Sequence, residues 1–106
     1  YRLELRKRHF KTSVLSNVGR GFFERIFEEM DPMEYFDDLV LSSEVGFVKP
    51  DHEIFELAAE RLMLNPPDCV FIDDRARFCS AAEAVGMKAL LYKSLPRLKE
   101  QLEPLL

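Results

Sequence analysis

The segment that most constrains the fold is residues 69–74, Cys-Val-Phe-Ile-Asp-Asp, an apolar run that ends on two adjacent carboxylates. A short β-branched and aromatic run between a Pro-Pro pair and a helical pattern is typical of a buried parallel strand. Asp73 and Asp74 then fall at the carboxyl end of this strand, where open α/β sheets bind their ligands. Because neighbouring carboxylates repel each other, a protein usually compensates them with a cation or a metal ion. The plainer alternative is that both acids cap the next helix or lie in solvent.

The bulk properties of the chain limit its size class and its partners. With 106 residues, a formal net charge of −4 and 47% hydrophobic residues, it fits one globular domain over residues 1–106. It has no basic run that would predict nucleic acid binding and no apolar stretch long enough for a membrane span. Cys69 and Cys79 lack metal-ligand spacing, so we interpret them as reduced, buried thiols of a cytoplasmic protein. We therefore expect neither a nucleic acid nor a membrane partner.

Short apolar runs alternate with helical patterns along the chain. Residues 1–9 look like the end of a solvated helix, and residues 43–51 are expected to form a loop. Gly86 is expected to end one helix in the left-handed conformation, and Ser94 to cap the last helix. The alternation predicts an α/β fold with a parallel sheet and right-handed crossovers. The predicted strands are residues 12–17, 38–42, 69–73 and 88–92, and the predicted helices are residues 22–30, 50–62, 78–85 and 95–102.

Polar side chains follow three of the predicted strands. Ser16 and Asn17 come after the first strand, Lys49 precedes a helix after the second, and Asp73 and Asp74 end the third. Since parallel strands open their carboxyl ends on one edge of the sheet, we expect all three groups to face one crevice. Hydroxyl and amide donors, one ammonium and a carboxylate pair suit a phosphate held together with Mg²⁺. The sequence therefore predicts a phosphate and magnesium site at this edge.

Four segments of the chain stand out together: Val-Leu-Ser-Asn at residues 14–17, Ser-Ser-Glu-Val-Gly-Phe-Val-Lys-Pro-Asp at residues 42–51, Phe-Ile-Asp-Asp at residues 71–74 and Ala-Ala-Glu-Ala-Val-Gly-Met at residues 81–87. Together they resemble the haloacid dehalogenase (HAD) superfamily, in the branch with a helical cap inserted early in the chain. The resemblance implies a Rossmann-like three-layer α/β/α sandwich. It also implies that Ser16 holds a transferring phosphoryl group and that Lys49 balances its charge. The pair Asp73 and Asp74 would bind Mg²⁺.

The acid pair also discriminates between activities within the superfamily. Dehalogenases of this branch typically carry a Ser-Ser-Asn-type sequence where this chain has Asp73 and Asp74, and they need no metal. Retaining both acids favours a Mg²⁺-dependent phosphatase. Phosphate-receiver domains also combine acids, a hydroxyl and a lysine, but their acid pair comes first and their lysine last, which is the reverse of the order here.

Three features depart from the family pattern. Phe78 stands where similar proteins usually have a small or polar residue, often Asn, and Arg75 and Arg77 beside the acids are unusual. The family's first motif, Asp-x-Asp-x-Thr, does not occur in the 106 residues. Its first Asp is the nucleophile, and its strand lies between the strands that end at Ser16 and Asp73. The resemblance thus implies the carboxyl-terminal part of a longer core domain, without nucleophile strand and cap, whose unpaired strand edges favour self-association.

The leading hypothesis is one half of a Mg²⁺-dependent phosphatase that acts on a small phosphorylated metabolite. Ser16, Asn17 and Lys49 would bind the phosphoryl group, with Lys49 also catalytic, and Asp73 and Asp74 would bind the metal. A second hypothesis is a non-catalytic binding or scaffold protein that kept the fold, and a third is a 2-haloacid dehalogenase. An Asp-x-Asp sequence upstream would support the enzyme over the scaffold, and haloacid turnover that survives a chelator would support the dehalogenase.

Overall fold

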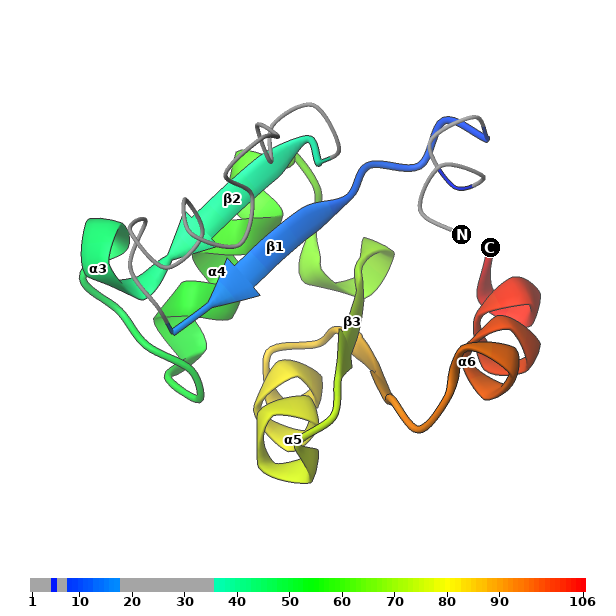
Figure 1. Ribbon diagram of the computed structural model, residues 1–106. Helices are drawn as coiled ribbons and strands as arrows, with labels where there is room; N and C mark the ends of the chain where they lie inside the picture. Colours follow the sequence, from blue (N-terminus) through cyan, green and yellow to red (C-terminus); the bar gives the residue numbers. More distant parts are fainter. Residues whose placement is uncertain (1–4, 6–7, 18–35) are drawn as a thin grey trace, which may run out of the picture.

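The computed structural model describes residue 5, residues 8–17 and residues 36–106 (Figure 1). The predicted helix at residues 22–30 lies outside the described residues. Most of residues 1–9, predicted as the end of a helix, lies outside them as well. The strands are β1 (Ser13–Ser16), β2 (Asp38–Leu41), β3 (Val70–Asp73) and β4 (Lys88–Leu91). The helices are α3 (Ser42–Val45), α4 (His52–Arg61), α5 (Ala76–Ala84) and α6 (Leu95–Leu102), with short 3₁₀ helices η2 (Pro66–Asp68) and η3 (Glu103–Leu105).

The four described strands form two separate parallel pairs. β1 pairs with β2 in the register Val14 to Leu39, and β3 pairs with β4 in the register Phe71 to Ala89. The parallel direction of both pairs confirms the α/β prediction. Among the described residues, no strand bridges β1 and β3, so the sheet is interrupted between them. This is the position where the resemblance places the nucleophile strand.

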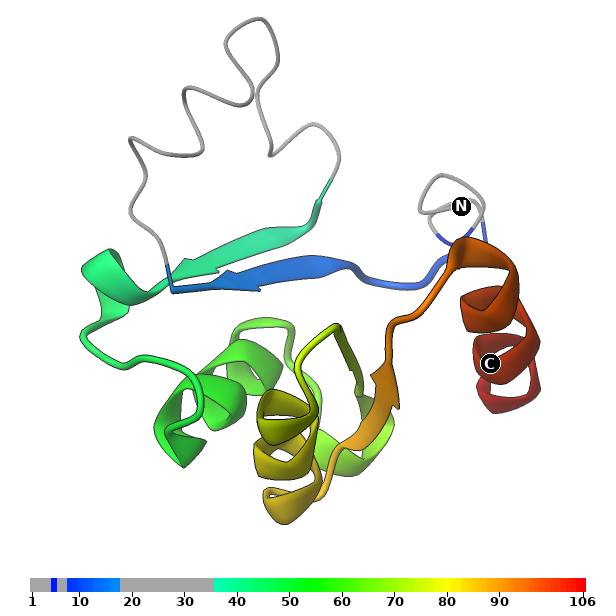
Figure 2. The ribbon, with the colours of Figure 1, turned by 60° about the horizontal axis from the view of Figure 1, so that its bottom comes forward.

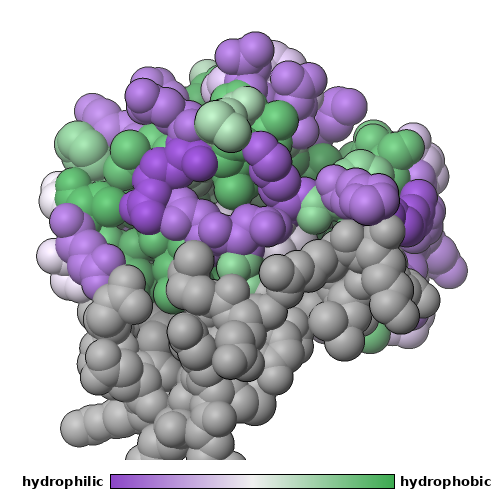
Figure 3. Space-filling view, turned by 90° about the horizontal axis from the view of Figure 1, so that it is seen from above, coloured by the Kyte–Doolittle hydropathy of each residue, from purple (hydrophilic) through white to green (hydrophobic). Residues whose placement is uncertain are grey.

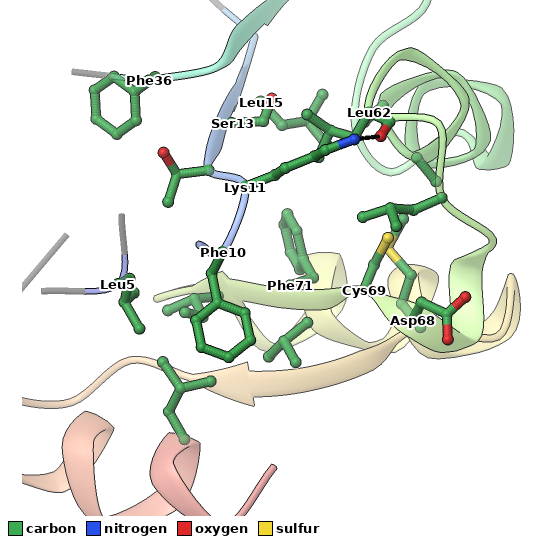
Figure 4. Close-up of a pocket in the computed structure, with 18 of the residues that line it drawn as sticks. Leu5, Phe10, Lys11, Ser13, Leu15, Phe36, Leu62, Asp68, Cys69 and Phe71 are labelled. Carbon is green, nitrogen blue, oxygen red and sulfur yellow. Dashed lines mark hydrogen bonds between the residues drawn. The ribbon is translucent and has the colours of Figure 1, made fainter. Parts of the chain in front are cut away.

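A groove with a volume of about 510 Å³ lies between β1 and β3. Phe10 and Phe71 point into it, and Lys11 spans its rim to donate a hydrogen bond of 2.7 Å to the carbonyl oxygen of Leu62 (Figure 4). The hydroxyl oxygen of Ser13 is buried beside this groove and has no hydrogen-bond partner among the described residues. The groove is mostly apolar, and its lining comes from both strands, from α4 and from the carboxyl terminus, including Val14, Leu15, Ala59, Leu62, Val70, Ile72, Leu102 and Leu105.

The core lies between the strands and the helix pair α4 and α5. These helices contact each other and lie on the same side of β1 and β2 (Figure 2). Phe55 is fully buried, and its ring meets the ring of Phe71 edge-on at a centroid distance of 5.0 Å. Edge-to-face packing of this kind suits aromatic rings and links α4 to β3. The buried cluster consists of Val40, Ile54, Phe55, Ala58, Ala59, Ala82 and Met87.

The predicted ends of two helices are confirmed. Gly86 has a φ of 99°, a left-handed conformation that a residue without a Cβ adopts at little cost, and it follows Val85, the C-cap residue of α5. The hydroxyl of Ser94 accepts a hydrogen bond of 3.4 Å from the backbone N–H of Arg97 and so caps α6.

Two boundaries after β2 differ from the prediction. Residues 42–45, expected mostly in a loop, form the one-turn helix α3, which ends at Gly46 with a φ of 81° and an N–H bonded to the carbonyl oxygen of Ser42. Pro50 was expected in the first turn of the next helix, but α4 begins at His52. Pro50 instead lies in a turn that the backbone hydrogen bond from Asp51 to Val48 closes, and its bond to Lys49 is cis.

The visible surface carries apolar and polar residues side by side. On the face seen from above, apolar side chains alternate with polar ones (Figure 3), as on most protein surfaces. None of the helices in the described ranges is long and apolar enough to cross a membrane.

Cys69 and Cys79 form no disulfide bond. Burial is the main cause that raises the pKa of each thiol, and nearby acidic groups raise it further.

Candidate functional site

The carboxyl ends of β1 and β3 meet through one chain of hydrogen bonds centred on Lys49. The side-chain amide of Asn17 donates a bond of 3.1 Å to the carbonyl oxygen of Lys49 and accepts one of 2.8 Å from its N–H. The ammonium of Lys49 then donates a bond of 2.9 Å to Oδ2 of Asp73. Asn17 lies 32 positions before Lys49 in the sequence, and Lys49 lies 24 positions before Asp73. The fold brings these three residues to one edge, as predicted.

The ammonium group of Lys49 is held in a mostly desolvated position. Its side chain is 10% exposed and that of its partner Asp73 is 12% exposed. The ammonium nitrogen also lies 4.8 Å from the ring centroid of Phe78 and 5.8 Å from that of Phe71. These are distances at which an aromatic face attracts a cation. Two rings and one carboxylate therefore fix the position of this charge.

Both carboxylate oxygens of Asp73 accept hydrogen bonds from the protein. Oδ2 accepts from Lys49, and Oδ1 accepts a bond of 2.9 Å from the backbone N–H of Arg75. Burial alone would raise the pKa of Asp73, but the hydrogen bonds from Lys49 and Arg75 and the positive charge of Lys49 lower it, and the pKa lies below its ordinary value. Asp73 is therefore ionised at neutral pH and holds Lys49 in place.

This lowered pKa predicts how stability depends on pH. The ion pair with Lys49 contributes its full stabilisation above the unfolded pKa of aspartate, about 3.9, and loses it as pH falls through the lower folded pKa. In urea unfolding of the complete protein, we expect wild type to be more stable than Asp73→Asn at pH 7. The difference should shrink below about pH 4. An equal difference at pH 7 and pH 3 would contradict the assignment.

Asp74 is exposed and lies directly after β3 at the same edge. The residue at the N-cap position of α5 is Arg75, with no side-chain capping bond, so Asp74 does not cap this helix. Mg²⁺ binds one or two carboxylates together with water and phosphate oxygens, and Asp73 and Asp74 supply that number. Residues 8–17 and 36–106 contain no group of three or more His, Cys, Asp or Glu side chains arranged around one point. The donor set thus fits a Mg²⁺ that takes its remaining ligands from elsewhere.

The structure adds two features of the site that the sequence did not indicate. Asn17 was expected to bind phosphate, yet its amide is bonded to the backbone of Lys49, which leaves one N–H of Nδ2 for a ligand. Phe78, noted in the sequence only as a departure, is 3% exposed and contacts the Lys49 ammonium. The i, i+29 spacing of these two residues is no recognisable signal, because the contact depends on how α5 packs.

Comparison with known proteins settles the family. A family model described as haloacid dehalogenase-like hydrolase matches residues 3–86. The chain belongs to the haloacid dehalogenase-like hydrolases. A wild-type HAD family enzyme from Bacteroides thetaiotaomicron, solved in complex with magnesium and inorganic phosphate, superimposes with a TM-score of 0.78 at 27% identity. The alignment covers 89% of this chain and 50% of that one, and it confirms the HAD-like α/β fold.

Two curated relatives of this HAD-like chain are named for phosphatase activity. A phosphatase from Mycobacterium tuberculosis is 34% identical over 89 residues, which cover 83% of this chain and 41% of that protein. A bifunctional riboflavin kinase/FMN phosphatase from Arabidopsis thaliana is 41% identical over 96 residues, covering 85% of this chain and 25% of that protein. The chain therefore spans less than half the length of these two relatives.

Proposed function

We propose that the protein containing this HAD-like chain is a Mg²⁺-dependent phosphatase that acts on a small phosphate monoester. The observation that carries the proposal is the hydrogen-bonded series from Asn17 through Lys49 to Asp73, which joins the carboxyl ends of β1 and β3. It places an ammonium, an amide N–H and an ionised carboxylate on one edge. The phosphatase relatives and the neighbour that holds magnesium and phosphate support the same reaction class.

In this proposal each side chain of the edge has a separate task. Ser16 and the remaining N–H of Asn17 donate hydrogen bonds to oxygens of the phosphoryl group, and Lys49 offsets their negative charge. Asp73 keeps the Lys49 ammonium at the strand ends, and Asp74 is the principal metal ligand of this chain. A bound Mg²⁺ would add positive charge next to the transferring phosphoryl group.

The nucleophile of such a reaction is absent from these 106 residues, which contain no Asp-x-Asp sequence. We propose that it is carried by a further parallel strand in the groove between β1 and β3. The groove is mostly apolar, and both flanking strands have a neighbour on one side only among the described residues. Its lining extends along β1 to Leu15 and along β3 to Ile72, the residues just before the ends of these strands. Residues 1–106 would then be one part of a single core domain.

The direct test is phosphate release by the complete protein from p-nitrophenyl phosphate and from a panel of small phosphate monoesters. We expect turnover with Mg²⁺ and its loss in excess EDTA, restored by added Mg²⁺. A parallel assay with a 2-haloacid should release no halide. Halide release that persists in EDTA, without phosphatase activity, would overturn the proposal in favour of a dehalogenase.

One observation favours a second candidate, a non-catalytic binding protein. Both oxygens of Asp73 already accept bonds from Lys49 and Arg75, so part of the acid charge is compensated within the chain. This candidate predicts that the complete protein binds inorganic phosphate but hydrolyses none of the tested esters, with or without Mg²⁺.

A further inference from the structure

The ring of Phe78 is the centre of a cluster of three cations at the candidate site. Phe78 lies in the first turn of α5 and is 3% exposed. The ammonium nitrogen of Lys49 is 4.8 Å from its ring centroid, and the guanidinium carbons of Arg77 and Arg75 are 4.9 Å and 5.5 Å away. Three like charges around one ring repel one another, so the arrangement needs attraction from the ring and from the acids at the end of β3.

Of the three cations, Lys49 should interact most strongly with the ring. Its side chain is 10% exposed, whereas Arg75 and Arg77 are exposed residues. A cation gains most from an aromatic face when both are removed from water, since water screens the attraction and solvates the competing charge. The carboxylate of Asp73 fixes the ammonium from a second direction at 2.9 Å.

We propose that Phe78 is a positioning residue for Lys49, whose ammonium it holds toward the phosphoryl site through the negative face of its ring. The proposal rests on the proposed phosphatase function for its kinetic consequence, but the contact itself is independent of activity. It assigns a task to a side chain that can neither donate to phosphate nor bind a metal. Phe55 has a different role, because its buried ring packs against the ring of Phe71, whereas the ring of Phe78 lies next to a cation.

The test separates the charge distribution of the ring from its shape. In the complete protein, Phe78 is replaced by phenylalanines with one, two and three ring fluorines, which weaken the negative face with little change in volume. We expect kcat/KM to fall stepwise along the series, and Phe78→Leu to lose about 3- to 30-fold. The melting temperature should stay close to wild type in the fluorinated proteins. The matched control is the same series at Phe55, where kcat/KM should stay constant.

A second measurement reads the contact without turnover. Protons on the ε carbon of Lys49, next to the ring, should show an upfield NMR shift that Phe78→Leu reduces. Constant kcat/KM along the Phe78 series in an active enzyme, or ε-proton shifts that Phe78→Leu leaves unchanged, would overturn the proposal. A stepwise loss that disappears in the Arg77→Gln background would also overturn it, because the ring would then act through Arg77. If wild type hydrolyses no phosphate ester, the phosphatase proposal fails, and the Lys49 shift alone decides the role of Phe78.

Discussion

Replacing Lys49 with methionine is expected to destabilise the complete protein and to remove nearly all of its phosphatase activity. Methionine fills the space between the Phe71 and Phe78 rings but leaves the Asp73 carboxylate, whose side chain is 12% exposed, without its cation. Removing one partner of a largely buried ion pair costs about 3 kcal/mol of unfolding free energy. Loss of the positive charge beside the phosphoryl group should lower kcat about 10²- to 10³-fold.

The double variant Lys49→Met/Asp73→Asn separates these two effects. Because it removes both charges and keeps both shapes, it should regain most of the lost stability, whereas activity should remain low. Urea unfolding and steady-state kinetics of the two variants measure the outcome. A Lys49→Met protein as stable as wild type, or a double variant with restored activity, would contradict the roles given to this pair.

Replacing Asp74 with asparagine is expected to abolish Mg²⁺-dependent turnover while leaving the fold intact. The side chain is exposed and does not cap α5, so the change in unfolding free energy should stay within about 0.5 kcal/mol. Asparagine keeps the shape but loses the charge that a hard cation requires. We expect kcat/KM to fall about 100-fold or more and the Mg²⁺ concentration for half-maximal activity to rise.

Asp68 provides the matched control for this variant. It is an exposed aspartate in η2, before β3 rather than after it. Asp68→Asn should leave both the activity and its Mg²⁺ dependence unchanged. Equal effects of the two substitutions would indicate a general influence of net charge, and full activity of Asp74→Asn would remove Asp74 from the metal site.

The strands and their direction could be predicted because they depend on local sequence. The run Val-Phe-Ile before Asp73 fits a strand on β-propensity and on apolar character alone, and alternation with helices implies parallel pairing. In a parallel sheet the carboxyl ends of the strands share one edge. The proximity of Asn17, Lys49 and Asp73 could therefore be predicted from the sequence.

The remaining features depend on packing that a one-dimensional pattern does not contain. The one-turn helix α3 relies on the left-handed Gly46 that closes it, and a run of four residues is too short for helical periodicity. The burial of Phe78 against Lys49 depends on the position of α5 relative to the loop before α4. The interruption between β1 and β3 could be expected only from the family resemblance, since no residue pattern marks a strand that is not in the sequence.

The most direct test of a phosphate and magnesium site at the joined strand ends is a Mg²⁺ titration of the complete protein in inorganic phosphate, followed by amide NMR. The account predicts shifts concentrated at Ser16, Lys49, Asp73 and Asp74, and their loss in the Asp74→Asn protein. No response at these four amides, or the same response in the Asp74→Asn protein, would contradict it.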